Sequence, residues 1–329
     1  MVLRAMITVG QWLLVCCYLL SALVFWVGDG LPLELQLLFP FLPVMVGLSV
    51  LLWVGDAMLF QRGRWVNLAG VVLGVAVILL CYGLPSIPGL TQHNEGPVLR
   101  VLTWNAQQLG NDTAKVREAI ELIREVDPDV LLLQEFGLYY KWPDVASVAL
   151  DFSERTGLPH FDFTPHAGNI FGTACFSKLP ISLIDNIFQL LSMTNEAKRY
   201  RIAWQGRTVN VVNAHLMSYN LFGQRNADEG LRLAEVLAAR LDQAKELTTQ
   251  PIDLLFGDLN AVPGDAVYQQ LIAAHTDAFR GVITPTHHYF PARIDHCFHT
   301  ESWEVVDAEL MTDFPSDHKA LMVELRPTD

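Results

Sequence analysis

The chain divides into two regions by the distribution of its hydrophobic residues. Up to about residue 90 nearly every position is apolar, and three uncharged stretches cover residues 5–28, 35–55 and 65–84. Each stretch is close to the roughly 20 residues that a membrane-spanning helix needs. The pattern therefore predicts about three transmembrane helices in a membrane segment of residues 1–90. Pro40 and Pro43 predict that the second helix is kinked or begins late.

The few charged residues of this segment predict its orientation. Arg4 precedes the first stretch, and Arg62 and Arg64 separate the second from the third, whereas the loop between the first two stretches carries only acidic residues. Basic residues favour the cytoplasmic side. We therefore expect a multi-pass protein of the plasma membrane whose residues after 84 are extracytoplasmic. If one stretch does not span, the topology inverts. The first stretch is long for a signal peptide and is followed by further apolar stretches, which favours an anchor.

From residue 91 the pattern changes to short apolar runs alternating with amphipathic segments. Apolar residues at 116, 120, 123 and 126 have helical spacing after Asp112, a favourable N-cap residue. Runs of strand length cover residues 98–103, 129–133, 209–212 and 252–256, and the pair 201–204 and 209–212 resembles a hairpin. Because hairpins are mixed with alternating strands and helices, a two-sheet α/β sandwich over residues 91–329 fits better than a doubly wound sheet.

Polar residues recur where these strands end. Asp258 and Asn260 follow the run 252–256, and Ser316-Asp317-His318 precedes an apolar run at 319–325. Residues two apart on extended backbone point the same way. Ionised groups at a buried strand edge are costly unless a cation or partner neutralises them. The pattern suits a hard metal ion bound by oxygen ligands, or a water held against a phosphate.

Charge and cysteine content narrow the possible partners. The net charge of −13 belongs entirely to residues 91–329, which carry 19 Lys and Arg against 32 Asp and Glu. Such a domain lacks the basic footprint of a tight nucleic-acid binder. The five cysteines have no metal-type spacing. Cys175 and Cys297 could form a disulfide outside the cell, but two buried free thiols are the favoured interpretation.

Seven short motifs occur in a fixed order along the domain. They are Thr103-Trp104-Asn105, Leu133-Gln134-Glu135, Gly172-Thr173-Ala174, Asn213-Ala214-His215-Leu216, Gly257-Asp258-Leu259-Asn260, Arg293-Ile294-Asp295-His296 and Ser316-Asp317-His318. In this order they resemble the endonuclease/exonuclease/phosphatase superfamily over roughly residues 98–326. The resemblance implies a four-layer, two-sheet α/β sandwich and metal-dependent hydrolysis of phosphate esters. The membrane segment lies outside it.

The resemblance implies a role for each matching residue on the metal and water side of the site. Glu135 corresponds to the carboxylate that binds the catalytic Mg²⁺ or Mn²⁺, and Asn105 and Asp317 correspond to residues near that ion. Asp258 corresponds to the residue that orients or deprotonates the attacking water. Asn260 corresponds to a donor to a transition-state oxygen.

The remaining roles concern the scissile phosphate. His318 corresponds to the histidine at that phosphate, and Asp295 to the carboxylate that holds this histidine. His215 corresponds to a residue that stabilises the phosphorane or the leaving group. The chemistry is reasonable by itself, because phosphoryl transfer needs charge neutralisation and an aligned water more than covalent help. An Asp–His pair fixes the imidazole tautomer and raises its basicity.

Each of these residues also has a structural explanation. Asp258 and Asn260 suit a turn after a strand, Glu135 suits a cap, and His215 suits a buried histidine. Seven coincidences in order are improbable, so the functional interpretation is favoured. His287 and its neighbour lie in a loop that is either merely exposed or contacts substrate.

The leading hypothesis is a membrane-anchored phosphoesterase that uses Mg²⁺ or Mn²⁺, with a lipid head group favoured over nucleic acid as substrate. The alternatives are an extracytoplasmic nuclease and a catalytically inactive, membrane-tethered binding module. Gly70 and Gly74 have a spacing typical of helix-packing motifs, which raises a further possibility, a membrane segment that binds a partner.

Overall fold

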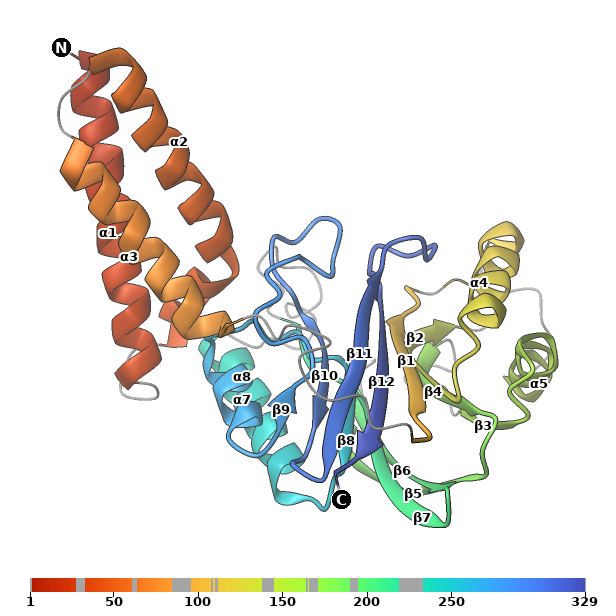
Figure 1. Cartoon of the computed structure of the whole chain (residues 1–329). Helices are drawn as coiled ribbons and strands as arrows, with labels where there is room; N and C mark the ends of the chain where they lie inside the picture. Colours follow the sequence, from red (N-terminus) through yellow and green to blue (C-terminus); the bar gives the residue numbers. More distant parts are fainter. Residues whose placement is uncertain are drawn as a thin grey trace.

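Two six-stranded β-sheets face each other in the computed structural model (Figure 1). The first sheet has the order β11 (Trp303–Met311), β12 (Ala320–Pro327), β1 (Leu99–Asn105), β2 (Val130–Gly137), β4 (Phe171–Ser177) and β3 (His160–Phe163). The second has the order β5 (Ile181–Gln189), β6 (Glu196–Trp204), β7 (Arg207–His215), β8 (Leu254–Asp258), β10 (Asp295–His299) and β9 (Thr276–Asp277). The structure describes residues 2–27, 33–60, 64–84, 96–107, 109, 112–137, 145–163, 165, 171–189, 195–218 and 233–328.

Helices cover the outer face of each sheet. The first sheet packs against α4 (Thr113–Val126) and α5 (Val145–Thr156), and the second packs against α7 (Leu233–Thr249) and α8 (Ala266–Ile272). A third apolar cluster fills the space between the sheets. The order helix, sheet, sheet, helix confirms the expected four-layer sandwich.

The predicted amphipathic helix at residues 113–126 is present as α4. The Asp112 side chain accepts hydrogen bonds from the backbone N–H groups of Ala114 and Lys115, so it caps the helix as expected. Val116, Ile120 and the other apolar residues of its inner face are buried against the first sheet. Local sequence signals therefore place this element correctly.

Strand pairing brings the carboxyl ends of four strands to one edge of the sandwich. β1 and β2 are parallel, with Asn105 opposite Gln134, and β7 and β8 are parallel, with His215 opposite Asp258. β10 runs antiparallel to β8 and begins with Asp295 opposite Asp258. The polar ends of separate chain segments therefore meet at one place.

The N-terminal region forms a helical unit beside the sandwich (Figure 1). It contains α1 (Val2–Val27), the 3-10 helix η2 (Leu33–Phe41), α2 (Leu42–Phe60) and α3 (Arg64–Tyr82). Because η2 contains Pro40, α2 begins at Leu42, which agrees with the expected late start. Among the described residues, Ala5–Val27 and Leu35–Met58 are long and apolar enough to cross a membrane. About three spans were expected; the third apolar segment, Leu68–Tyr82, is shorter.

The helical unit is docked on the sandwich. The Gln36 side chain accepts a hydrogen bond of 2.8 Å from the Ala266 N–H at the start of α8, and the Gly281 N–H donates to the Tyr82 carbonyl at 2.7 Å. One buried cluster includes Phe39 and Tyr82 of the helical unit together with Ile294 of the sandwich. Ile294 directly precedes Asp295, so this contact lies next to the strand that carries a predicted site residue.

Gly70 and Gly74 pack inside the helical unit. A Cβ atom at Gly70 would approach Gln11 and Val15 of α1, and one at Gly74 would lie 2.8 Å from Tyr18. The small residues therefore allow α3 to approach α1 closely, so this packing takes place within the chain. All five cysteines are free, and Cys175 and Cys297 are buried, as the favoured interpretation predicted.

Candidate active site

Asp258 lies at the centre of a buried polar cluster at the shared strand edge. The Asn105 side-chain amide donates a hydrogen bond of 2.9 Å to Asp258 Oδ2. The Nε2 atoms of His215 and His318 lie 3.6 Å and 3.8 Å from the same oxygen. All four residues are buried, and they come from β1, β7, β8 and the segment before β12. One carboxylate oxygen thus faces one amide and two imidazoles.

Backbone geometry around Gly257 brings His215 and Asp258 together. Gly257 has a φ of 137°, and a Cβ atom there would overlap the carbonyl oxygen of Ala214 on β7. The absence of a side chain therefore permits the close approach of β7 and β8 that sets these two residues side by side.

Asn260 completes a tight turn after β8. It has a φ of 48°, a conformation that asparagine tolerates better than most residues. Its backbone N–H donates to Asp258 Oδ1 at 3.0 Å, and its side-chain amide donates to the Leu216 carbonyl at 3.0 Å. The turn interpretation of Asp258 and Asn260 is therefore correct as local structure, and the turn holds the Asp258 carboxylate in place.

Asp295 and His318 form a buried carboxylate–imidazole pair. His318 Nδ1 lies 3.0 Å from Asp295 Oδ2. Burial disfavours the protonated imidazole, but the carboxylates of Asp295 and Asp258 outweigh it and raise the pKa of His318 to about 10. Burial and the charge of Asp258 raise the pKa of Asp295. The Trp104 indole N–H donates to the His318 carbonyl at 3.3 Å, which fixes the backbone of this histidine.

Asp317 lies beside this pair, and two side chains hold its Oδ2 atom. The Gln107 amide donates to Asp317 Oδ2 at 2.7 Å, and His287 Nε2 lies 3.3 Å from the same oxygen. Burial alone would raise the pKa of the Asp317 carboxyl, but the hydrogen bond from His287 and the charge of His318 lower it overall. The carboxylate form, which metal binding requires, is therefore favoured.

Glu135 reaches the cluster from an irregular part of β2. The pairing of β2 with β4 shifts register between Leu133 and Phe136, and Glu135 has a φ of 49°. Such a bulge redirects a side chain at a sheet edge. Glu135 Oε1 lies 3.9 Å from His215 Nε2.

A polar layer between the sheets supports the cluster from below. The Gln134 amide donates to Thr103 Oγ1 and to Asn213 Oδ1, and the Asn213 amide donates to the carbonyls of Leu133 and Ala174. These bonds connect both sheets directly beneath the strand ends. They satisfy the amide groups of Gln134 and Asn213 as donors, while Gln134 Oε1 has no hydrogen-bond partner in the part of the chain that the structure describes, and they limit relative movement of the sheets.

The structure gathers all eight predicted site residues into one linked group. Three of them contact Asp258 directly, namely Asn105, His215 and His318, and Asp295 is joined through His318. The backbone N–H of Asn260 donates to Asp258, and Glu135 is joined through His215. Asp317 is joined through Gln107, whose backbone N–H donates to Asn105 Oδ1. Sequence reasoning did not single out Gln107, it named Gln134 in a motif without giving it a role, and it left the role of His287 open. Gln107 stands two residues after a predicted site residue, which was the only available signal.

The predicted ligands Glu135, Asn105 and Asp317 supply oxygen atoms, the donor type that a hard divalent cation prefers. Among the described residues, two trios bring ligand atoms within 4.8 Å of one another: Asp258, Asp295 and His318, and His287, Asp317 and His318. Neither trio contains Glu135, and the raised pKa of His318, which belongs to both, favours a protonated imidazole that does not bind a metal. Oxygen ligands from carboxylates and an amide suit Mg²⁺ or Mn²⁺. Burial and, to a smaller extent, the negative charge of Asp258 raise the pKa of Asp295, which is a second reason why positive charge is stabilising here.

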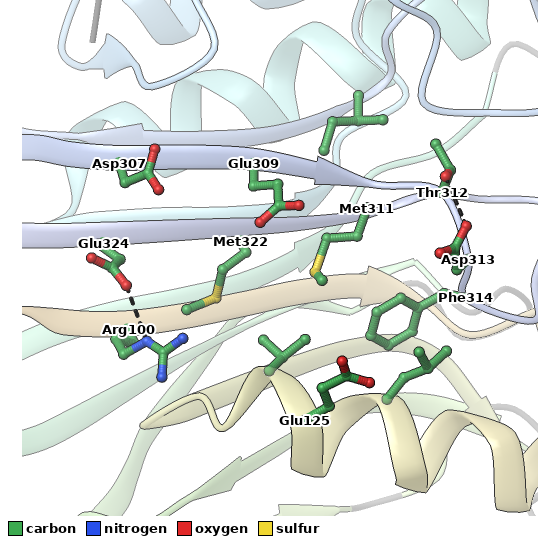
Figure 2. A pocket seen from close by; sticks show the side chains of 13 residues that line it. Arg100, Glu125, Asp307, Glu309, Met311, Thr312, Asp313, Phe314, Met322 and Glu324 are labelled. Atoms are coloured by element: carbon green, nitrogen blue, oxygen red, sulfur yellow. Dashed lines mark hydrogen bonds and ion pairs between the residues drawn. The ribbon is translucent and has the colours of Figure 1, made fainter. Parts of the chain in front are cut away.

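A separate groove of about 420 Å³ lies between α4 and the strands β11 and β12 (Figure 2). Its lining includes Asp307, Glu309 and Glu125 around the side chains of Met311 and Met322. None of the eight predicted site residues lines it. Its carboxylates therefore provide controls for charge removal outside the site.

Comparisons with solved structures show where this fold occurs. An endonuclease/exonuclease/phosphatase from Beutenbergia cavernae is 20% identical, with a TM-score of 0.52, and the match covers 70% of this chain and 72% of that chain. The catalytic domain of human Nocturnin, solved with a bound sulfate anion, is 20% identical, with a TM-score of 0.51 and coverage of 72% and 97%. At this identity the likeness concerns the fold. No curated protein matches the chain by sequence.

The model of the Endonuclease/Exonuclease/phosphatase family matches residues 102–318, which is well over half of the chain and extends from β1 to His318. This chain therefore belongs to the endonuclease/exonuclease/phosphatase family.

Proposed function

We propose that this protein is a membrane-anchored hydrolase of phosphate esters that requires a divalent metal ion. The observation that carries the proposal is the buried contact of Asp258 with Asn105, His215 and His318. A buried carboxylate surrounded by these groups can hold a water molecule and withdraw a proton from it. Members of the family are generally hydrolases of phosphoester bonds, which agrees with this assignment.

The residues take complementary parts in an in-line attack of water. Asp258 orients and deprotonates the water, and Asn260 donates to an oxygen of the transition state. His318, held by Asp295, and His215 contact the phosphate and stabilise its developing charge. The raised pKa of His318 favours its protonated form, which suits this contact with an anion.

Glu135, Asn105 and Asp317 are the proposed ligands of Mg²⁺ or Mn²⁺. When bound, the ion supplies a Lewis acid that neutralises charge on the phosphate. The lowered pKa of Asp317 and the oxygen-rich donor set support this assignment.

A lipid head group is the proposed substrate. The helical unit packs against Ile294, next to Asp295, so membrane insertion of α1 and α2 would keep the site near the bilayer. The net charge of −13 disfavours tight binding of a polyanion such as duplex DNA. We further propose that α1, α2 and α3 span the plasma membrane and that the catalytic domain is extracytoplasmic.

The test uses the full chain in detergent and in lipid vesicles. Hydrolysis of bis-p-nitrophenyl phosphate, p-nitrophenyl phosphate, sphingomyelin and plasmid DNA is measured with Mg²⁺, with Mn²⁺ and with EDTA. We expect EDTA-sensitive turnover that falls by about 10³-fold in Asp258→Asn, because the amide is no base. Asp307→Asn, an exposed carboxylate of the groove in Figure 2, should retain full activity.

The outcomes separate the alternatives. Turnover of sphingomyelin vesicles above that of DNA supports the lipid substrate, whereas strong hydrolysis of plasmid DNA with none of lipid would make this an extracytoplasmic nuclease. Lack of turnover on every substrate, together with no Mn²⁺ binding by calorimetry, would indicate an inactive binding module.

A further inference from the structure

His287 occupies a defined position at the edge of the site. Its ring packs edge-on against the ring of His318, with centroids 4.6 Å apart and an interplanar angle of 88°. A β-bridge pairs the two residues, and the His288 N–H donates to the Asp317 carbonyl at 2.8 Å. The loop that carries His287 is therefore fastened to the segment that carries Asp317 and His318.

The hydrogen bonds of His287 determine which nitrogen carries its proton. The backbone N–H of Tyr289 donates to His287 Nδ1 at 3.0 Å, so Nδ1 is an acceptor without a proton. In the neutral ring the proton is then on Nε2, which lies 3.3 Å from Asp317 Oδ2. Nε2 is consequently a donor to the carboxylate.

This tautomer does not suit a metal ligand. A histidine that binds a metal through one nitrogen normally donates the N–H of the other nitrogen to a carbonyl or carboxylate. Here the second nitrogen faces a donor, the Tyr289 N–H. The trio of His287, Asp317 and His318 therefore has ligand-like distances but not the hydrogen bonds of a metal site.

We propose that His287 is a positioning residue that fixes the Asp317 carboxylate through its Nε2–H and does not itself bind the ion. The inference rests on the proposed role of Asp317 as a metal ligand. Asp317 Oδ2 also accepts from Gln107 at 2.7 Å, so two donors on opposite chain segments hold one oxygen. The other oxygen, Oδ1, has a contact of 3.4 Å with the Ser316 hydroxyl.

The loop that carries His287, whose role the sequence left open, thus supports the Asp317 carboxylate. Loss of such a partner typically weakens metal affinity or activity by about 10- to 100-fold. Because Gln107 remains, we expect the lower end of this range when His287 is removed.

The test is calorimetric titration of Mn²⁺ into the full-length protein in detergent. We expect one Mn²⁺ per chain in the wild type and in each of the three variants. His287→Ala should raise the Kd by about 10-fold, whereas His287→Gln, which keeps a side-chain N–H donor, should stay within about 3-fold of the wild type. His288→Ala is the matched control, because His288 is exposed and contributes a backbone N–H.

Three results would count against the proposal. Two Mn²⁺ per wild-type chain, with one lost in His287→Ala, would make His287 a ligand. An unchanged Kd in His287→Ala, with normal binding by the wild type, would remove its positioning role and leave the proposed function intact. A wild type that binds no Mn²⁺ would overturn both. Circular dichroism of each variant verifies that the fold is retained.

Discussion

At the scale of residues, Asp277, Arg293 and His296 form one buried ionic network next to the turn that carries Asn260. The Arg293 guanidinium donates to both oxygens of Asp277 and, at 2.7 Å, to His296 Nδ1. His296 Nε2 in turn lies 2.8 Å from the carbonyl oxygen of Ala261, the residue after Asn260. Because removal of one partner from a buried pair is costly, this network is expected to stabilise the turn that carries Asn260.

The network gives the stability of the domain a defined pH dependence. Burial and the charge of Arg293 lower the pKa of His296 from 6.5 to about 3. The unfolded chain therefore binds a proton at higher pH than the folded one. The contribution of neutral His296 to the free energy of unfolding is therefore complete above pH 6.5. It is lost as the pH falls toward 3, by up to about 1.4 kcal/mol per pH unit.

His296→Gln should flatten this dependence. Urea unfolding of the full chain in EDTA at pH 4.5, 5.5, 6.5 and 7.5 measures the free energy of unfolding of the sandwich. We expect the variant to be less stable than the wild type at pH 7.5 and to approach it at pH 4.5. His288→Gln, which changes an exposed histidine elsewhere in the chain, should keep the wild-type slope. Parallel slopes for wild type and His296→Gln would contradict the assignment.

At the scale of elements, the close pairing of β7 and β8 depends on the absence of a side chain at one position. Gly257 has no room for a Cβ atom because the Ala214 carbonyl of β7 lies there. The strands must separate to admit any side chain, and His215 and Asp258 would separate with them.

Gly257→Ala should therefore both destabilise the sandwich and abolish activity. We expect a loss of about 3 kcal/mol or more in the free energy of unfolding, measured by urea titration, since backbone overlap adds to the cost of a positive φ. Gly206→Ala is the control, because Gly206 also has a positive φ of 74° but nothing lies within 4 Å of its Cβ position. Its cost should stay near 1 kcal/mol with full activity. Equal effects of the two changes would refute the overlap argument.

Elements with strong local signals could be predicted from the sequence, and long-range contacts could not. The apolar spacing and Asp112 cap defined α4, and the apolar runs before Asn105 and Asp258 defined β1 and β8. The bulge that redirects Glu135 depends on pairing with β4, which no local pattern encodes.

The same distinction applies to the candidate site. Its eight residues were predicted through motif order, but Gln107 and His287 act on Asp317 from positions 210 and 30 residues away in the chain. Docking of Gln36 on α8 likewise joins segments 230 residues apart. Such partners become visible only when the chain is folded.

At the scale of the whole molecule, the helical unit predicts that the chain is retained in membranes with a defined orientation. The full chain should remain with vesicles after a carbonate wash, because α1 and α2 are long and apolar enough to span. Protease added to intact spheroplasts should digest the sandwich, and protease added to inverted vesicles should not. Digestion only in inverted vesicles would reverse the proposed orientation. Release by carbonate would contradict the proposal that the helices span the membrane.

Under the proposed function, the docked helical unit would fix the distance between the site and the bilayer. A domain joined to a membrane anchor by a flexible linker can occupy a range of distances from the membrane, and the range grows with the length of the linker. Here Gln36 and Tyr82 of the helical unit hydrogen-bond directly to the sandwich. Insertions between residues 84 and 96 should therefore leave the distance from bilayer to Asp258 unchanged. Such an enzyme would search for substrate by lateral diffusion in two dimensions, and its rate would follow the surface density of substrate more than its bulk concentration.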